Sequence, residues 1–127
     1  LNNNPSFKTL REKVQRASGK HWLKGIDGRK LLIRTQHAAL NTLLQGGGAI
    51  VMKRGLAMLD SLISLNTFDA KFVANIHDEW QMEVREDLAE NVGRMAVGRI
   101  IKAGEYYNLR CPMDGEYKVG DNWSETH

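Results

Sequence analysis

Apolar residues recur every three to four positions in three parts of the chain, a spacing that predicts amphipathic helices. The first part is FKTLREKVQRAS, residues 7–18, for which Ser6 or a neighbour is the expected N-terminal cap. The second part, residues 37–65, is long and apolar enough to predict a mostly buried helix. The third part begins at EDLAENV, where Asp87 and Glu90 have the spacing of a capping box.

Two other stretches predict β-hairpins. In HWLKGIDGRKLLIR, residues 21–34, two apolar runs flank a turn signal at Asp27-Gly28. The second hairpin has the strands AKFVANI, residues 70–76, and WQMEV, residues 80–84, joined by a polar tip. The tip residues are His77, Asp78 and Glu79. Helices combined with antiparallel hairpins predict an α+β fold.

A run of three glycines, Gly46-Gly47-Gly48, interrupts the long helical pattern. Each glycine in a helix interior costs roughly 1 kcal/mol relative to alanine. The run therefore leaves two possibilities: either the helix breaks there, or something large approaches its backbone closely.

Length and composition suit one globular domain, because 127 residues of which 42% are hydrophobic supply a core. The sequence has no apolar run of 18 residues, so we expect no membrane span and a cytoplasmic setting. The net charge of +3 is unevenly distributed: residues 1–34 carry nine Lys and Arg against two acids, a balance of +7, so the remainder is −4. This asymmetry suits a protein that grips a polyanion with one part and binds cations with the other, although solvated surfaces would have the same composition.

The hairpin tip concentrates groups that bind hard cations. Asp78 and Glu79 offer carboxylate oxygens suited to Mg²⁺, and a tight turn holds such ligands rigidly. Pairs of ions about 3.5–4 Å apart recur in nucleotidyl transfer and need carboxylates from at least two places in a fold. The sequence offers one convincing place, so the tip has the character of half a metal centre. The alternative is a merely polar turn, since His and Asp favour turns.

A second polar set lies on the predicted long helix. His37, Asn41 and Gln45 fall at positions i, i+4 and i+8, and Arg34 lies one turn earlier. A ladder of His, Asn and Gln side chains suits the hydrogen-bond acceptors of the DNA minor groove, where reading is largely independent of sequence. A solvated helix face has the same pattern.

The two sets occur in the order and spacing of a known family. LIRTQHAALNTLLQGGGAIVMKRGLAML, followed by ANIHDEWQMEV and a tail ending GDNWSETH, resembles the C-terminal palm region of family A (Pol I type) DNA polymerases, most closely the branch of tailed bacteriophages. The resemblance implies a partial polymerase palm, in which the antiparallel hairpin carrying His-Asp-Glu packs on one long and two shorter helices. It also implies a fingers base and basic hairpin over residues 1–36, and the C-terminal half of the palm over residues 37–127.

The resemblance also implies roles for individual residues. Asp78 is similar to the second metal-binding aspartate of the polymerase centre, and Glu79 to the adjacent acid with a supporting role. His77 resembles the histidine that approaches the primer terminus. Asn41 and Gln45 match the pair that contacts the minor groove of the primer–template.

The two expected DNA-binding residues that precede Asn41 in the sequence match the family less closely. His37 stands where many members have Arg, and Arg34 is expected to bind DNA through its charge. The family's first metal-binding aspartate and its nucleotide-binding fingers helix have no counterpart in these 127 residues.

These departures predict that the chain does not polymerise DNA alone. We expect a two-ion Mg²⁺ site completed by an upstream aspartate, and a partner that is the N-terminal polymerase chain or segment. Leu1 in place of Met leaves three possibilities, a subunit of a split polymerase, a product cut from a longer polymerase or a mere fragment, of which we favour the split or cleaved polymerase. The expected substrates are primer–template DNA and dNTP, in the host cytoplasm if a phage encodes the chain. The alternative is a non-catalytic DNA-binding accessory protein derived from a polymerase tail.

Overall fold

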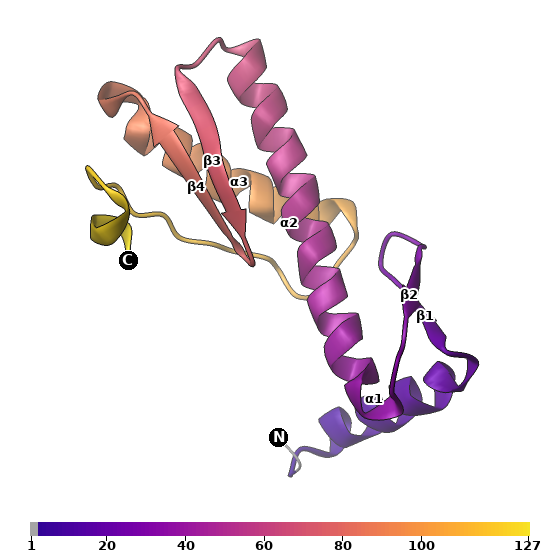
Figure 1. Ribbon diagram of the computed structural model, residues 1–127. Coiled ribbons are helices and arrows are strands. Elements are labelled where there is room, and N and C mark those ends of the chain that lie inside the picture. The colour runs from indigo at the N-terminus through magenta and orange to yellow at the C-terminus, as the bar shows by residue number, and fades with distance from the viewer. Residues whose placement is uncertain (1–2) are drawn as a thin grey trace. The chain divides into compact units, whose positions relative to one another are not determined.

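The structure is a computed structural model that describes residues 3–127, in two compact units, the first ending at Ile50 and the second beginning at Val51 (Figure 1). Helices are combined with two small antiparallel hairpins, which confirms the mixed α+β composition. The described residues contain no helix that is both long and apolar enough to cross a membrane. The boundary expected after residue 36 concerns polymerase subdomains and stays a prediction.

Helix α1 (Pro5–Ala17) opens the first unit and is capped by Asn4, whose side-chain oxygen accepts hydrogen bonds from the backbone N–H groups of Ser6 (3.0 Å) and Phe7 (3.3 Å). Pro5 occupies the first helical position, where its missing N–H costs nothing. The cap is thus the neighbour of Ser6, two residues upstream. The helix is amphipathic, with Val14 buried among the residues of the first unit.

Strands β1 (Trp22–Lys24) and β2 (Lys30–Leu32) form the first hairpin and confirm the turn expected at Asp27-Gly28. The Arg29 guanidinium lies 2.5 Å from Asp27 and lowers the pKa of that carboxyl. Gly28 has a φ of 87°, which residues other than glycine rarely adopt. Both strands are short, and the small core beside them includes Leu23 of β1 and Ile33, which directly follows β2. The core comprises Val14, Leu23, Ile33, Ala39 and Leu40.

Helix α2 (Ala39–Leu65) is continuous through the glycine run, so the first of the two possibilities for Gly46-Gly47-Gly48 is wrong. Gly46 faces the first hairpin: a Cβ there would lie 3.1 Å from the Leu31 side chain. At Gly47 and Gly48, a Cβ would meet no atom of the described residues within 4 Å. The helix is also less buried than expected, because Leu44 and Leu65 are exposed.

The second unit combines the end of α2, the hairpin of β3 (Ala70–Ile76) and β4 (Glu79–Val84), and helix α3 (Ala89–Tyr106). These three parts converge at Gly55 of α2, where a Cβ would lie 3.0 Å from the Trp80 ring and 3.4 Å from the Arg99 carbonyl oxygen. Absence of a side chain at Gly55 therefore lets Trp80 pack directly against the helix backbone. The second unit therefore contains the hairpin, the end of α2 and α3. Helix α1, the other shorter helix of the expected set, belongs to the first unit.

The capping box expected at the start of α3 is wrong. A short 3-10 turn, Glu86–Leu88, precedes the helix, and no side chain caps it among the described residues. Asp87 instead pairs with Arg85, with Oδ1 2.6 Å from Nε and Oδ2 3.0 Å from the second nitrogen. This fork lowers the pKa of Asp87 and raises that of Arg85.

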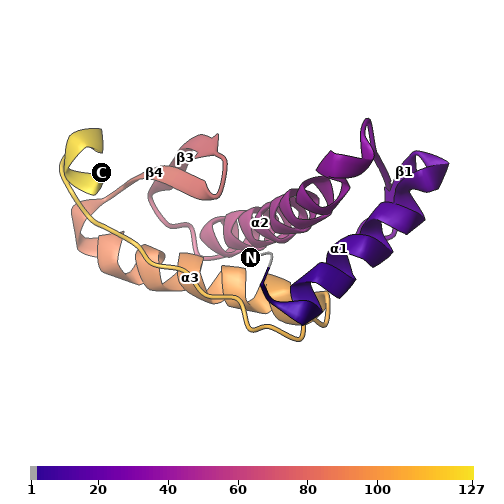
Figure 2. The same cartoon turned by 90° about the horizontal axis from the view of Figure 1, so that it is seen from below.

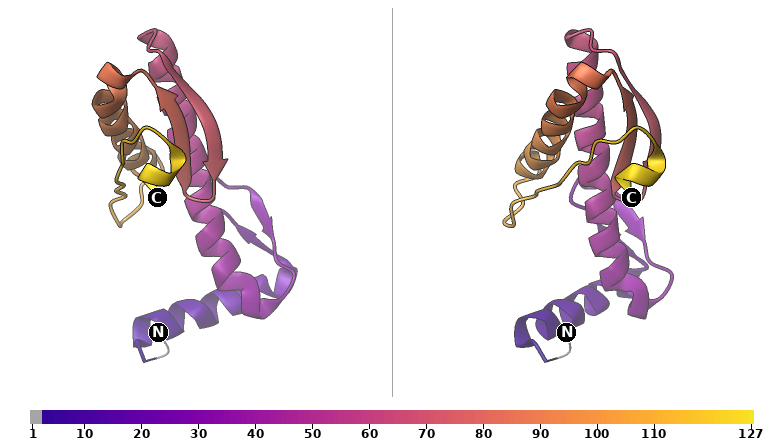
Figure 3. Two further views of the ribbon diagram at one scale, coloured as in Figure 1. Left: turned by 60° about the vertical axis from the view of Figure 1, so that its left-hand side comes forward. Right: turned by 90° about the vertical axis from the view of Figure 1, so that its left-hand side faces the viewer.

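After Tyr106 the chain runs back along α3 and then reaches the second hairpin (Figures 2 and 3). We call residues 107–127 the tail. Two glycines of α3 receive tail side chains: a Cβ at Gly93 would overlap the Tyr117 ring, and one at Gly104 would lie 3.0 Å from Met113 Cβ. The Tyr117 hydroxyl donates a 2.6 Å hydrogen bond to Glu90. The tail is therefore fastened to α3 before it reaches the strands.

Candidate functional site

The second hairpin ends in a two-residue turn, because Ile76 pairs with Glu79 across the ladder. His77 and Asp78 form the turn, and His77 has a φ of 54°. Histidine is among the residues enriched at positive φ, which makes this local sequence suited to a tight turn. Both side chains are exposed to solvent. The expected three-residue tip needs correction, since Glu79 is the first residue of strand β4.

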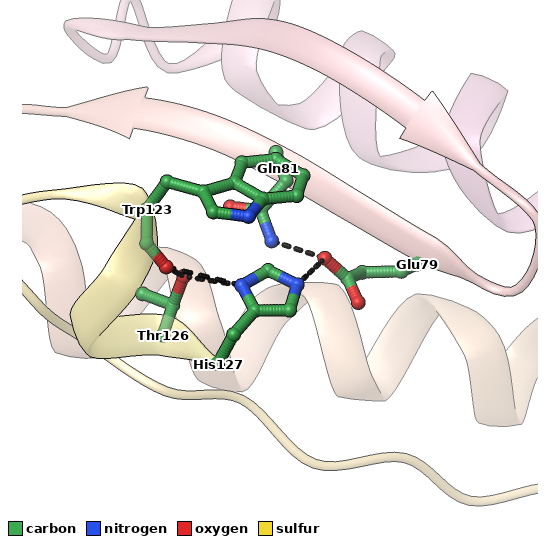
Figure 4. Close-up of polar contacts among 5 residues, drawn as sticks. All are labelled: Glu79, Gln81, Trp123, Thr126 and His127. Carbon is green, nitrogen blue, oxygen red and sulfur yellow. Dashed lines mark hydrogen bonds and ion pairs between the residues drawn. The ribbon is translucent and has the colours of Figure 1, made fainter.

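The position of Glu79 in the strand determines its neighbours. Successive strand residues face opposite sides, so Glu79 and Gln81 share one face while Trp80 packs toward Gly55 on the other. The Gln81 amide donates a hydrogen bond to Glu79 Oε1. A second donor comes from the tail: His127 Nε2 lies 2.9 Å from the same oxygen (Figure 4). The Glu79 side chain is 42% exposed, so water also reaches it.

His127 is itself supported by the end of the tail. Its ring stacks on Trp123 with centroids 4.4 Å apart and an interplanar angle of 12°. Its Nδ1 lies 3.0 Å from the Trp123 carbonyl oxygen, to which the Thr126 hydroxyl also donates at 2.9 Å. A carbonyl oxygen only accepts hydrogen bonds, so this contact needs a proton on Nδ1, and Nε2 then donates to Glu79 only when the imidazole carries both protons. The ring therefore has both its plane and one nitrogen constrained.

Neither Gln81 nor His127 was among the expected site residues. Gln81 had a sequence signal, because positions i and i+2 of a strand lie on the same face. His127 had none, since the path of a turn-rich tail does not follow from local sequence.

The polar residues expected on the long helix are arranged differently from the prediction. Asn41 and Gln45 are exposed at adjacent turns of α2, as the spacing requires. His37 lies instead in the 3-10 turn Gln36–Ala38 that precedes the helix, and Arg34 lies in the connection after β2. Of the expected ladder, Asn41 and Gln45 therefore lie within α2 itself, and His37 lies in the turn that leads into it. All four side chains are exposed and belong to the first unit.

The donor set at the hairpin tip fits a hard divalent cation in chemistry but not in number. Asp78 and Glu79 supply carboxylate oxygens, which Mg²⁺ prefers. Among residues 3–127, however, no three His, Cys, Asp or Glu side chains gather closely enough to form a metal site. One oxygen of Glu79 is also taken by its two donors. The tip therefore offers a partial set of ligands, with Asp78 the less encumbered of the two.

Comparison with known proteins identifies the family. The model of DNA polymerase family A matches residues 8–125. Over 149 aligned residues the chain is 36% identical to the DNA-directed DNA polymerase of Enterobacteria phage T3 and 34% identical to that of Escherichia phage T7. Each comparison includes all of this chain and 21% of the phage protein, so the chain spans about a fifth of the length of these relatives.

The fold agrees with a solved structure. The POL domain of Pol1 from M. smegmatis, in complex with a DNA primer-template and dNTP, matches with a TM-score of 0.70 and 19% identity. The match covers 76% of this chain and 19% of that chain, which shows a shared fold over most of the residues. Because the family model spans nearly the complete sequence, the chain belongs to DNA polymerase family A.

Proposed function

We propose that the chain is the C-terminal part of a template-directed DNA polymerase, in which it contributes the second metal-binding aspartate, Asp78, to nucleotidyl transfer. The observation that carries the proposal is a solvent-exposed Asp78 on a two-residue hairpin turn, in a chain that matches the family over residues 8–125. In this proposal, residues 37–127 are the C-terminal half of the palm and residues 1–36 are the fingers base.

Each residue at the tip has a separate task in this proposal. Asp78 binds Mg²⁺, which when bound neutralises charge on the phosphates and aligns the reacting oxygens. Glu79 supports the site from the first position of strand β4, with one oxygen already fixed by its neighbours. His77, exposed beside Asp78, approaches the primer terminus. A single aspartate does not hold two ions, so the other carboxylate must come from outside these residues.

The missing carboxylate defines the partner. The chain spans about a fifth of the length of its phage relatives, which leaves room for an upstream segment that bears the first aspartate. We propose that this segment, on the same or another polypeptide, completes the site and binds dNTP, in the host cytoplasm if the polymerase is a phage protein. The chain alone is then inactive.

The exposed face of α2 is the proposed contact with primer–template DNA. Asn41 and Gln45 offer amide donors for the acceptors of the minor groove, and Gly48 continues the same face at i+7. His37 and Arg34 add donors and charge just before the helix. Glycine lowers the stability of a helix interior, but at Gly48 no side chain projects from the exposed backbone. A DNA duplex can therefore approach the helix closely at this position.

A pair of glycine substitutions tests this DNA face. Gly48→Leu should weaken primer–template binding by the complete polymerase about tenfold, equivalent to ~1.4 kcal/mol, because the new side chain separates Asn41 and Gln45 from the groove. Gly47→Leu is the matched control, since Gly47 is equally open among the described residues but points about 100° around the helix. Fluorescence anisotropy with a labelled duplex measures both. Equal affinities for the two variants would contradict the assignment.

Primer extension tests the proposed function itself. The 127-residue chain, the N-terminal remainder and their mixture should be assayed separately with Mg²⁺, dNTP and a primed template. We expect extension by the mixture and by neither part alone, because each part supplies one carboxylate. Full activity of the remainder alone would instead assign this chain to the accessory DNA-binding class.

A further inference from the structure

Glu79 differs from Asp78 in being held by two side chains. Gln81, two residues along strand β4, and His127, from the far end of the tail, both donate to Oε1. In Figure 4 the two dashed lines that reach Glu79 both end on that oxygen. A carboxylate bonded from two directions keeps one rotamer, and its second oxygen keeps one direction. The same carboxylate with one donor would rotate more freely.

The route by which His127 reaches the hairpin is built into the tail. Tyr117 is anchored on α3 through Glu90 and fills the space above Gly93. Further along, the final 3-10 turn, Trp123–Thr126, is capped by Asn122, whose side chain accepts from the Glu125 N–H at 3.2 Å. Trp123 then stacks on the His127 ring. Each of these contacts restricts the position of the imidazole, whereas a terminal residue without a structural role would not need such contacts.

A second set of contacts tightens the bend before that turn. The Glu125 carboxylate accepts a 2.6 Å hydrogen bond from the Asp121 backbone N–H. Gly120 makes room for it, because a Cβ there would lie 2.6 Å from Glu125 Cβ. The segment GDNWSETH is therefore a compact structure whose polar side chains bond to its own backbone, and the His127 ring is the group that contacts the strand.

We propose that His127 is a positioning residue for Glu79: the tail carries its imidazole to the start of strand β4, where His127 and Gln81 together orient the carboxylate beside the metal-binding Asp78. This inference rests on the proposed polymerase function and adds to it a residue 48 positions after Glu79 in the sequence. In this proposal His127 acts through Glu79, the carboxylate that it contacts. Loss of the imidazole therefore lowers the rate of the chemical step without changing the affinity for primer–template DNA.

The test uses the complete polymerase that contains this chain, with single-nucleotide incorporation measured under single-turnover conditions. His127→Ala should lower the maximal rate about tenfold, the size expected for a lost hydrogen bond to a charged group, with an unchanged Kd for primer–template DNA. His127→Gln should recover most of the rate, because its amide N–H replaces Nε2 as a donor. An unchanged thermal melting curve for His127→Ala shows that the loss is not a loss of folding.

A double-mutant cycle decides whether the effect passes through Glu79. In a Glu79→Ala background, His127→Ala should change the rate less than about twofold, since its partner is gone. The same tenfold loss in both backgrounds would overturn the proposal and assign His127 a direct role on another group. A wild-type rate for His127→Ala would overturn it as well. These outcomes are separable from failure of the proposed function, which would appear as normal extension by Asp78→Ala.

Discussion

Replacing Asp78 with alanine is expected to reduce Mg²⁺-dependent primer extension by the complete polymerase about 10²–10³-fold. This is the range for removing one preorganised electrostatic contact to the transition state. The physical reason is that catalysis of phosphoryl transfer depends mainly on positioned cations, and Asp78 is the most exposed carboxylate at the tip. Binding of primer–template DNA should persist, because Asn41 and Gln45 are unchanged. Single-turnover incorporation and duplex anisotropy measure the two effects separately.

The matched control for Asp78→Ala is Glu83→Ala. Glu83 is an exposed carboxylate on the same hairpin, paired with Lys71 in the strand register and remote from the turn. Its removal changes the net charge by the same amount and should leave extension intact. Near-wild-type extension by Asp78→Ala, or equal losses for the two variants, would contradict the metal assignment.

Gly93→Ala is expected to destabilise the protein by about 1–3 kcal/mol, the usual cost of overpacking a filled space. The added methyl group would overlap the Tyr117 ring, which must then move and lose its hydrogen bond to Glu90. Chemical denaturation measures the loss of stability. Limited proteolysis should also show faster cleavage within residues 107–122, because the tail is no longer fastened to α3.

The same helix provides the control. Gly98 is also in α3, but a Cβ there would meet no described atom within 4 Å. Gly98→Ala should therefore raise the free energy of unfolding by roughly 0.5–1 kcal/mol, because alanine restricts the unfolded chain and favours the helix. If Gly93→Ala and Gly98→Ala changed the free energy of unfolding in the same direction, the packing of Tyr117 on Gly93 would be contradicted.

The hairpins and helices followed from sequence because their signals are local. The strand of residues 70–76 is formed as expected, and α2 spans nearly the predicted range. Boundaries and caps were less predictable where two partners compete for one group. Asp87 was expected to cap α3, but the neighbouring Arg85 forms a bidentate pair with it, and a charged fork outcompetes a single backbone N–H.

The candidate site was predictable only in part, for a similar reason. The acids at the tip have a recognisable pattern, and their family resemblance supplied the roles. His127 approaches Glu79 through contacts between residues far apart in the sequence, and no periodicity encodes such contacts. The predicted helix began two residues too early at His37, because the chain enters α2 through a tighter 3-10 turn.

The two-residue turn at His77 and Asp78 has a final consequence for insertions and deletions. One residue added to or removed from the turn would exchange the two faces of β4, which would expose Trp80 and direct Glu79 toward Gly55 of α2. A substitution at the turn removes one functional group, whereas a change of length displaces all the groups of the strand. Chain length at this tip should therefore be the least variable property of the site, more restricted than the identity of its residues.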